Sequence, residues 1–270
     1  MAATYSDSRD LGTIERALQL MKCMATAGKR GLALTQLASA TALPHSTVHR
    51  LLHRLIAERM VIQSESTKRY MLGPLAFELG IAASMMFDLR EPCRKFLSEL
   101  ADEVGDTIYL TIRSGGDAVC LDRYEGPSPI RVLTLNVGSR RPMGFGAGGL
   151  AMLAFMPAEE REELIVSLAS KAPADGYLSE ADLRAAVTAC RQRGYSLIRN
   201  RVNLGVTAVG VPLFDSLDQP CAAISVAAID ERMSAARIAS LALNLQNRAK
   251  AIRQVLGTSG QAGNVAARYS

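Results

Sequence analysis

The sequence predicts an α+β protein with two domains, a small helical domain at the N-terminus and a larger mixed domain after it. The chain has 270 residues, which is enough for two modest hydrophobic cores. Helical periodicity runs through residues 14–58, and the alternation typical of strands begins near residue 108. Gly73 and Pro74 interrupt the pattern between the two parts. We expect domains at 11–72 and 89–256, a linking and dimerisation helix at 73–88, and a flexible tail at 257–270.

The first 72 residues have the pattern of a winged helix-turn-helix. Apolar residues recur every three or four positions in 14–27 and in 45–58, and a short helix lies between these segments. Thr13 and Thr35 are expected to be the N-caps of the first two helices, because a threonine hydroxyl accepts the free N–H groups there. Two short strands joined by a polar turn, at 61–63 and 69–72, follow as the wing.

The rest of the chain predicts a curved sheet with helices at its ends and on one face. A glycine-rich loop at 138–149 leads into one of these helices, and residues 114–117 form a tight turn between two strands. The predicted helices span 75–87, 92–104, 148–155, 158–170, 180–193 and 234–256. The predicted strands span 108–112, 118–123, 130–135, 195–198, 206–214 and 222–228.

Positive charge is concentrated in the first quarter of the chain. Residues 14–70 contain nine lysines and arginines against three acidic residues, whereas residues 71–270 contain 21 of each. The whole chain has a formal net charge of +5. A local excess of this kind is expected of a domain that binds a polyanion, although a chance arrangement of solvated side chains would give the same count.

The outer face of the third helix offers side chains suited to a DNA major groove. At 100° per residue, two hydroxyl residues and two arginines lie opposite the apolar stripe, and His49 lies on its flank. Arginine pairs with guanine edges, serine or threonine reaches bases or phosphates, and basic residues of a wing contact the backbone. The partner is then double-stranded operator DNA, and the predicted DNA-binding residues are Arg16, Thr35, Ser46, Thr47, His49, Arg50, Arg54, Lys68 and Arg69.

Enzyme chemistry is not predicted, because the chain places its histidines elsewhere. All three, His45, His49 and His53, lie in the third helix, so a Ser-His or Cys-His pair has no histidine in the larger domain. Their four-residue spacing can bind a metal, but the outer two diverge by about 80° around the helix and no cysteine or carboxylate ligand is near. We expect no catalytic site, no metal and no cofactor.

The cysteines and the hydropathy predict a reduced, cytoplasmic protein. The five cysteines are scattered and form no C-x-x-C motif. Cys120 and Cys221 lie within predicted strands, where a cysteine acts as a small buried hydrophobe. The sequence has no apolar window of about 18 residues, and its polar N-terminus is unlike a signal peptide, so no membrane contact is expected.

The glycine-rich loop before the 148–155 helix is a candidate ligand site. Free N–H groups at a helix N-terminus bind a carboxylate, and glycines let a ligand approach the backbone closely. The loop is not a Walker motif, because it has no Lys-Ser/Thr ending, and it does not fit a dinucleotide site. The alternative is a loop whose small residues serve packing alone. We favour the ligand site, which needs apolar walls and a few polar groups.

Several segments in order resemble the IclR-type family of transcriptional regulators. In the N-terminal part these are Ile14-Glu-Arg-Ala-Leu18, Leu43-Pro-His-Ser-Thr-Val-His-Arg-Leu-Leu52 and Arg69-Tyr-Met-Leu-Gly73. In the larger part they are Leu121-Asp-Arg123, Gly138-Ser-Arg-Arg-Pro142, Gly194-Tyr195, Val209-Gly-Val-Pro-Leu-Phe-Asp215 and Ala223-Ile-Ser-Val226. The resemblance covers about residues 11–256.

The resemblance implies a GAF-like effector-binding domain, a homodimer or homotetramer, and control by a small organic acid or aromatic effector. The loop and the resemblance together give a predicted effector site of Ile130, Leu133, Met143, Gly146, Ala147, Gly148, Ala208 and Ser225. Three departures from many relatives, Arg199-Asn-Arg201 in place of an acidic residue, Ala208 in place of cysteine and Ala227 in place of serine, make the site less polar. A bulkier, more apolar acid such as an aromatic one is therefore expected.

We interpret the chain as a regulator whose dimers place two recognition helices on a pseudo-palindromic operator. An effector in the larger domain would change the population of DNA-competent dimers through the 75–87 helix. The alternative is a DNA-binding protein whose larger domain serves dimerisation alone and binds no effector.

Overall fold

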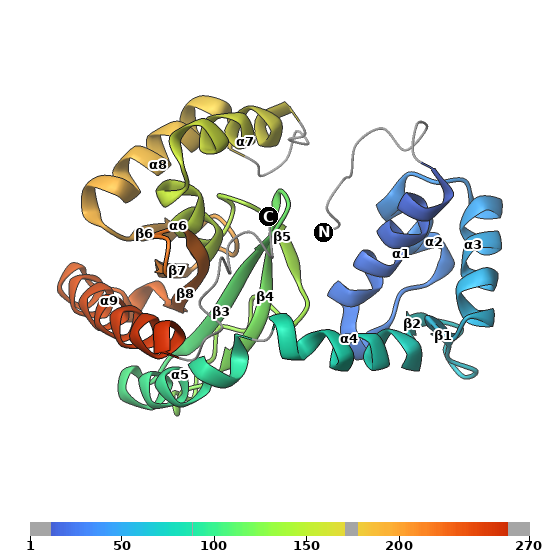
Figure 1. Ribbon diagram of the computed structural model, residues 1–270, viewed down its shortest axis with the longest axis horizontal. Helices are drawn as coiled ribbons and strands as arrows, with labels where there is room; N and C mark the ends of the chain where they lie inside the picture. Colours follow the sequence, from blue (N-terminus) through green and yellow to red (C-terminus); the bar gives the residue numbers. More distant parts are fainter. Residues whose placement is uncertain (1–11, 88, 171–177, 259–270) are drawn as a thin grey trace. The chain divides into compact units, whose positions relative to one another are not determined.

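A computed structural model of the chain describes residues 12–87, 89–170 and 178–258. The chain divides into two compact units, one formed by the part before Leu89 together with Gly138–Arg140 and the other by the rest, and each unit is described by itself. The α+β class and the two-part organisation expected from the sequence are confirmed (Figure 1). Of the predicted tail, residues 259–270 lie outside the described residues.

The N-terminal unit is a three-helix domain with a two-stranded wing. Its helices are α1 (Thr13–Ala27), α2 (Leu34–Thr41) and α3 (His45–Ala57), and its strands are β1 (Val61–Gln63) and β2 (Tyr70–Leu72). One apolar face of each helix is buried in a common core, which also receives the first residue of each strand. The core residues include Leu20, Met24, Leu37, Val48, Leu51, Leu52, Val61 and Tyr70.

The predicted N-caps of the first two helices were wrong. Thr13 is the first residue inside α1, whose N-cap is Gly12, and Thr35 lies inside α2, whose N-cap is Ala33. In α2 the side chain of Gln36 reaches back to the N-cap residue, where its Oε1 accepts a hydrogen bond from the Ala33 N–H at 3.0 Å. This is half of a capping box, and it orients the start of α2 without a polar N-cap.

Helix α4 (Pro74–Phe87) follows the wing and exposes apolar side chains. Phe77 and Ile81, one turn apart, are 70% and 55% exposed, and Leu79 is 54% exposed. A helix with this much exposed apolar surface is typical of a surface that packs against another chain.

The larger unit is built on one antiparallel sheet of six strands in the order β5-β4-β3-β8-β7-β6. The strands are β3 (Thr107–Ser114), β4 (Asp117–Tyr124), β5 (Arg140–Pro142), β6 (Ser196–Arg199), β7 (Val206–Phe214) and β8 (Pro220–Ile229). Tyr109 of β3 is paired with Ser225 of β8, which is paired with Gly210 of β7. These three residues therefore point to the same face of the sheet.

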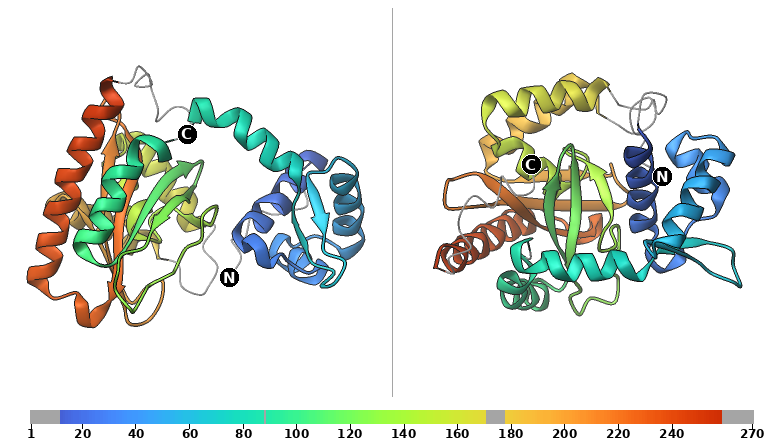
Figure 2. Two further views of the ribbon diagram at one scale, coloured as in Figure 1. Left: turned by 90° about the horizontal axis from the view of Figure 1, so that it is seen from below. Right: turned by 45° about the vertical axis from the view of Figure 1, so that its right-hand side comes forward.

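Helices cover both faces of this sheet, not one face as the sequence predicted. Helices α5 (Arg90–Val104) and α9 (Ala235–Thr258) pack on one face, and α6 (Ala147–Phe155) with α7 (Ala158–Ser170) and α8 (Glu180–Arg193) packs on the other (Figure 2). The reason is visible in β8, where nine of ten residues are buried without alternation. Such a strand is covered on both sides.

The segment 130–135, predicted as a strand, forms none. The edge of β4 is instead paired with the short strand β5 from further along the chain. Polar groups of the 130–137 segment bond to side chains of the sheet, beginning with the Tyr109 hydroxyl, which donates to the Val132 carbonyl at 2.6 Å. The segment therefore lies beside the sheet as irregular backbone whose hydrogen bonds come from side chains.

Candidate functional site

The exposed face of α3 is the first candidate site. Val48, Leu51 and Leu52 are buried in the N-terminal core, so the opposite side of the helix faces solvent. Exposed side chains on that side include Ser46, His49, Arg50, His53 and Arg54, while Thr47 is half-buried. The amphipathic pattern of the sequence thus fixes which side chains a DNA groove would meet.

Two uncompensated arginines give this face its charge. In the described part of the chain neither Arg50 nor Arg54 forms an ion pair, and both line a shallow open depression with His49, His53 and Ala57. The rings of His49 and His53 lie 5.9 Å apart between centroids. Free guanidinium groups beside imidazoles form a surface that can bind phosphates and base edges.

The remaining residues predicted to contact DNA differ in how exposed their side chains are and in whether those side chains are bonded within the domain. Thr35 and Lys68 are exposed, and Lys68 lies at the tip of the wing with φ of 55°. Arg16 is half-buried on α1. The Arg69 guanidinium donates to the Gly31 carbonyl at 3.1 Å, so it holds the wing against the helices. If Arg69 contacts DNA, its guanidinium must do so while it keeps, or after it breaks, the hydrogen bond to Gly31.

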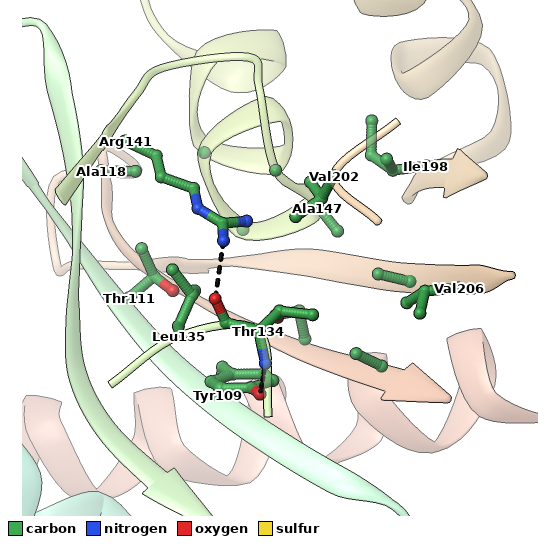
Figure 3. Close-up of a pocket in the computed structure, with 16 residues that line it drawn as sticks. Tyr109, Thr111, Ala118, Thr134, Leu135, Arg141, Ala147, Ile198, Val202 and Val206 are labelled. Atoms are coloured by element: carbon green, nitrogen blue, oxygen red, sulfur yellow. Dashed lines mark hydrogen bonds between the residues drawn. The ribbon is translucent and has the colours of Figure 1, made fainter. Parts of the chain in front are cut away.

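The second candidate site is a pocket between the start of α6 and the sheet (Figure 3). It encloses about 620 Å³ of empty space, part of which is open to solvent. The lining residues are Tyr109, Thr111, Ala118, Thr134, Leu135, Arg141, Gly146, Ala147, Gly148, Gly149, Ile198, Val202, Val206, Ala208, Ser225 and Ala227.

The N-terminus of α6 presents uncapped N–H groups to this pocket. Its N-cap is Gly146, which has no side chain to accept them. The first intrahelical bond runs from the Leu150 N–H to the Gly146 carbonyl at 2.9 Å, so the three preceding N–H groups have no intrahelical partner. With the positive end of the helix dipole, these groups can bind an anion.

Close backbone approach explains two of the glycines near this helix. A Cβ on Gly148 would lie 2.9 Å from Oγ1 of Thr111, and a Cβ on Gly210 would lie 2.9 Å from the backbone of Ala147. Neither position has room for a side chain, so the start of α6 lies directly on β3 and β7.

Two buried hydroxyls face the same pocket. Ser225 of β8 is 6% exposed and Thr111 of β3 is 4% exposed. Within the described residues, neither hydroxyl forms a hydrogen bond through its side chain. Buried polar groups are normally hydrogen-bonded, so both can donate to a bound acceptor.

One cation also lines the pocket. The Arg141 guanidinium of β5 donates through Nη2 to the Thr134 carbonyl at 2.6 Å (Figure 3). Burial lowers the pKa of Arg141, but arginine stays protonated in proteins. The other walls are aliphatic, and include Leu135, Ile198 and Val206.

The predicted effector residues divide into two groups. The pocket brings together Gly146, Ala147, Gly148, Ala208 and Ser225. The remaining three do not line it, since Ile130 and Leu133 are about half exposed and Met143 lines a separate small hollow beside α8.

Sequence reasoning missed the polar groups that the fold adds to the pocket. Tyr109 and Thr111 alternate along a strand whose sequence is typical of a hydrophobic core. The sequence around Arg141 is compatible with an ordinary surface arginine. The available signal was the position of Arg141 beside Pro142, within the glycine-rich loop already identified as a candidate site.

The cysteines offer no second chemistry. All five are buried, and none of them forms a disulfide. Burial raises the pKa of Cys120, Cys190 and Cys221 to about 12, which keeps these thiols protonated at neutral pH. Over the described ranges there is also no group of three or more potential metal ligands, and no helix there is both long and apolar enough to cross a membrane.

Both parts of the chain match known protein families. Residues 13–65 match the family described as "IclR helix-turn-helix domain", and residues 82–254 match "Bacterial transcriptional regulator IclR C-terminal". The chain is 33% identical over 221 residues to the "Probable transcriptional regulator SauR" of Cupriavidus necator, covering 81% of this chain and 86% of that protein. It is 26% identical over 258 residues to the "Transcriptional repressor IclR" of Escherichia coli, covering 94% and 93%.

Solved structures show the same fold. An IclR-type regulator from Alicyclobacillus acidocaldarius is similar with a TM-score of 0.73 at 20% identity, covering 92% of this chain and 100% of that chain. An IclR family regulator from Brucella abortus is similar with a TM-score of 0.71 at 22% identity, covering 92% and 94%. These identities support the architecture and carry no information on ligands.

Proposed function

The chain belongs to the IclR family of bacterial transcriptional regulators, and from this we propose which DNA surface and which class of effector it uses. It is a DNA-binding regulator with a C-terminal effector-binding domain, and not an enzyme. We propose that α3 reads the operator and that the pocket at α6 binds a small organic carboxylic acid. Because its target is operator DNA, the protein acts in the cytoplasm.

One observation carries the effector class. The uncapped N-terminus of α6 opens into a pocket that is also lined by Thr111 and Ser225, two residues with little exposure whose hydroxyls form no hydrogen bond within the described residues. Several donors around an otherwise apolar space fit one group with two strong acceptors, which is a carboxylate. A neutral amide or alcohol would leave some of these donors unsatisfied, at a cost in affinity.

The walls favour an acid with an apolar body. Ile198, Val202, Val206 and the two alanines Ala208 and Ala227 give the pocket much of its apolar lining. These side chains cannot bond to hydroxyl groups on a ligand, but they gain free energy by covering a hydrocarbon. An aromatic acid fits this division better than an acid of two or three carbons.

The DNA proposal rests on α3 and on a paired arrangement of chains. A single recognition helix reads few base pairs, so regulators with this motif bind as dimers over two half-sites. The exposed apolar residues of α4, Phe77 and Ile81 above all, are the surface that we assign to pairing of two copies. The mass of the protein in solution, measured by sedimentation, distinguishes a dimer from a tetramer.

Calorimetry tests the effector proposal. Purified protein is titrated with benzoate, phenylacetate, 4-hydroxybenzoate, pyruvate and acetate, and operator DNA is obtained by selection from random sequences. We expect the aromatic acids to bind more tightly than acetate and pyruvate. Tight binding of a two- or three-carbon acid without any aromatic acid would contradict the apolar-body proposal. Operator binding without any bound acid would leave the larger domain as a dimerisation domain only.

A further inference from the structure

The Arg141 guanidinium is a half-buried cation without a counter-ion among the described residues. Among the residues that the structure describes, no carboxylate pairs with it. It contacts the Thr134 carbonyl, at 2.6 Å from Nη2, and the ring of Phe145, whose centroid is 5.8 Å from Cζ. Other arginines of the same unit are paired, as Arg113 is with Glu160 and Arg123 is with Glu125.

This arrangement leaves most of the guanidinium's donors available. Arginine has five N–H groups, and the bond to Thr134 uses one of them. A partly desolvated charge is costly unless it is paired, so an anion bound beside Arg141 would recover part of that cost. The guanidinium points into the space that Thr134 and Ala147 border (Figure 3).

We propose that Arg141 is the residue that selects the charge of the effector, by pairing its guanidinium with the effector's carboxylate. This inference rests on the proposed function of the pocket. The α6 N–H groups and Arg141 line the same pocket, and a carboxylate has about four lone-pair sites on two oxygens, so both can bond to one carboxylate. Removing the charge from the ligand then leaves the half-buried guanidinium of Arg141 unpaired.

Arg141 also connects the ligand to the 130–137 segment. Side chains of the sheet hold this segment at three more points: the Tyr109 hydroxyl donates to the Val132 carbonyl and accepts the Thr134 N–H, and Arg123 donates to the Leu135 carbonyl. Arg141 is the charged side chain that both lines the pocket and bonds to this segment. A bound carboxylate fixes the guanidinium, and through it the Thr134 carbonyl.

The test compares acids with their neutral amides in Arg141 variants. Benzoate, phenylacetate, 4-hydroxybenzoate and pyruvate are each paired with the corresponding primary amide, which has a similar shape and no charge. For Arg141→Gln we expect the tightest-binding acid to lose about 30-fold or more in affinity, as expected for truncation of a buried charged pair, while the amide changes by less than about threefold. Arg141→Lys keeps the positive charge but loses the paired N–H donors of the guanidinium, so its affinity for the acid should lie between those of the wild type and Arg141→Gln.

Arg123→Gln is the matched control, because it removes a bond to the same segment from a side chain outside the pocket lining. It should leave the ratio of acid to amide affinity unchanged. Hydrogen exchange of the Thr134 amide adds a second readout: the acid should slow this exchange in the wild type, and should not do so in Arg141→Gln at saturation.

Equal losses for acid and amide, or no loss for either, would overturn the role of Arg141 and leave the carboxylate proposal standing. A wild type that binds none of the acids would overturn both proposals. If Arg141→Gln does not fold, the ratio of acid to amide affinity in Arg141→Lys decides in its place, and a ratio equal to that of the wild type would contradict the inference.

Discussion

Arg50 and Arg54 lie one turn apart on the exposed face of α3, and the described structure gives neither of them a carboxylate partner. A surface arginine that is already paired gives up an interaction when it binds a phosphate or a base, whereas an unpaired one does not. Arg59 provides the contrast within the same domain, because its guanidinium donates to Glu78 at 3.1 Å. At the scale of single residues, DNA recognition is therefore expected to depend on the free pair.

Arg50→Ala should weaken binding to the selected operator by about 10- to 100-fold, the range for loss of one arginine contact to a base. Fluorescence anisotropy at a fixed salt concentration measures this change. Arg59→Ala removes the same charge from the same domain and should change operator affinity by less than about threefold. Equal losses for the two variants would mean that net charge, and not the α3 face, determines binding.

The buried thiols give a second prediction at this scale, in the stability of the fold at high pH. Burial raises the pKa of Cys120, Cys190 and Cys221 from 9.0 to about 12. A raised pKa contributes stability below pH 9 that is lost as pH rises toward 12, because the unfolded chain ionises first. At pH 10 each thiol lowers the free energy of unfolding by roughly 1 kcal/mol.

Urea unfolding at pH 7.5, 9 and 10 measures this loss. The Cys190→Ala variant lacks one of the three thiols, so its stability should fall less steeply with pH than that of the wild type. If the free energy of unfolding depended on pH in the same way for the two proteins, the raised pKa of Cys190 would be contradicted.

Some residues that line the pocket could be predicted from the sequence, and others could not. Gly146, Ala147 and Gly148 could be predicted, because a helix N-terminus rich in glycine has a local signature. Arg141 lies in the same glycine-rich loop, but whether its side chain faces the pocket depends on strands far away in the sequence. Ile130 and Leu133 were predicted as lining residues on the assumption of a strand, and the irregular backbone turns both toward solvent.

Among the elements, α6 is the one on which the effector site depends. Its first turn lies so close to the sheet that a Cβ on Gly210 of β7 would meet the backbone of Ala147 at 2.9 Å. Backbone cannot move aside as a flexible side chain can, so a methyl group there must displace the helix.

Gly210→Ala should lower the free energy of unfolding by about 1–3 kcal/mol, the usual cost of overpacking. It should also weaken acid binding, because the α6 N–H groups move. Chemical unfolding and calorimetry measure the two effects. Gly116→Ala is the control, since its added Cβ would make only an ordinary contact of 3.8 Å with Leu164. A Gly210→Ala protein as stable as the wild type would show that this close approach is not needed.

Helix α4 gives a prediction about assembly. With Phe77 and Ile81 both changed to Glu, two charges enter the surface that we assign to pairing, and the dimer should weaken by at least about 100-fold, because a charge buried without a partner is strongly unfavourable. Sedimentation velocity measures the mass. Glu78→Gln, on the same helix, should leave the dimer intact. A double variant that remains a dimer would place the pairing surface elsewhere.

Most elements could be predicted from periodicity, and the exceptions have local physical causes. The helices 158–170 and 180–193 and the strand 206–214 agree with α7, α8 and β7 at both ends. Thr13 and Thr35 failed as N-caps because Gly12 and Ala33 precede them in extended conformation. Burial of β8 on both faces has a signal in its sequence, because its apolar residues run almost without interruption, but the prediction of helices on one face did not use it.

The whole molecule joins a positively charged reading domain to a nearly neutral sensor domain. The division of charge was evident in the sequence, and the two compact units agree with it. A regulator of this kind works only if the two units are energetically coupled, so that the acid prefers one DNA-binding state by about 1–3 kcal/mol. By linkage, the operator must then change the affinity for the acid by the same factor.

Operator affinity, measured by mobility shift at stated salt with and without the tightest-binding acid, decides whether the pocket and α3 are coupled. We predict that a saturating acid changes the Kd for operator by about 5- to 150-fold, in either direction. The same acid should produce little change in Arg141→Gln at equal concentration. An operator Kd that is unchanged while calorimetry shows the pocket to be saturated would contradict this coupling.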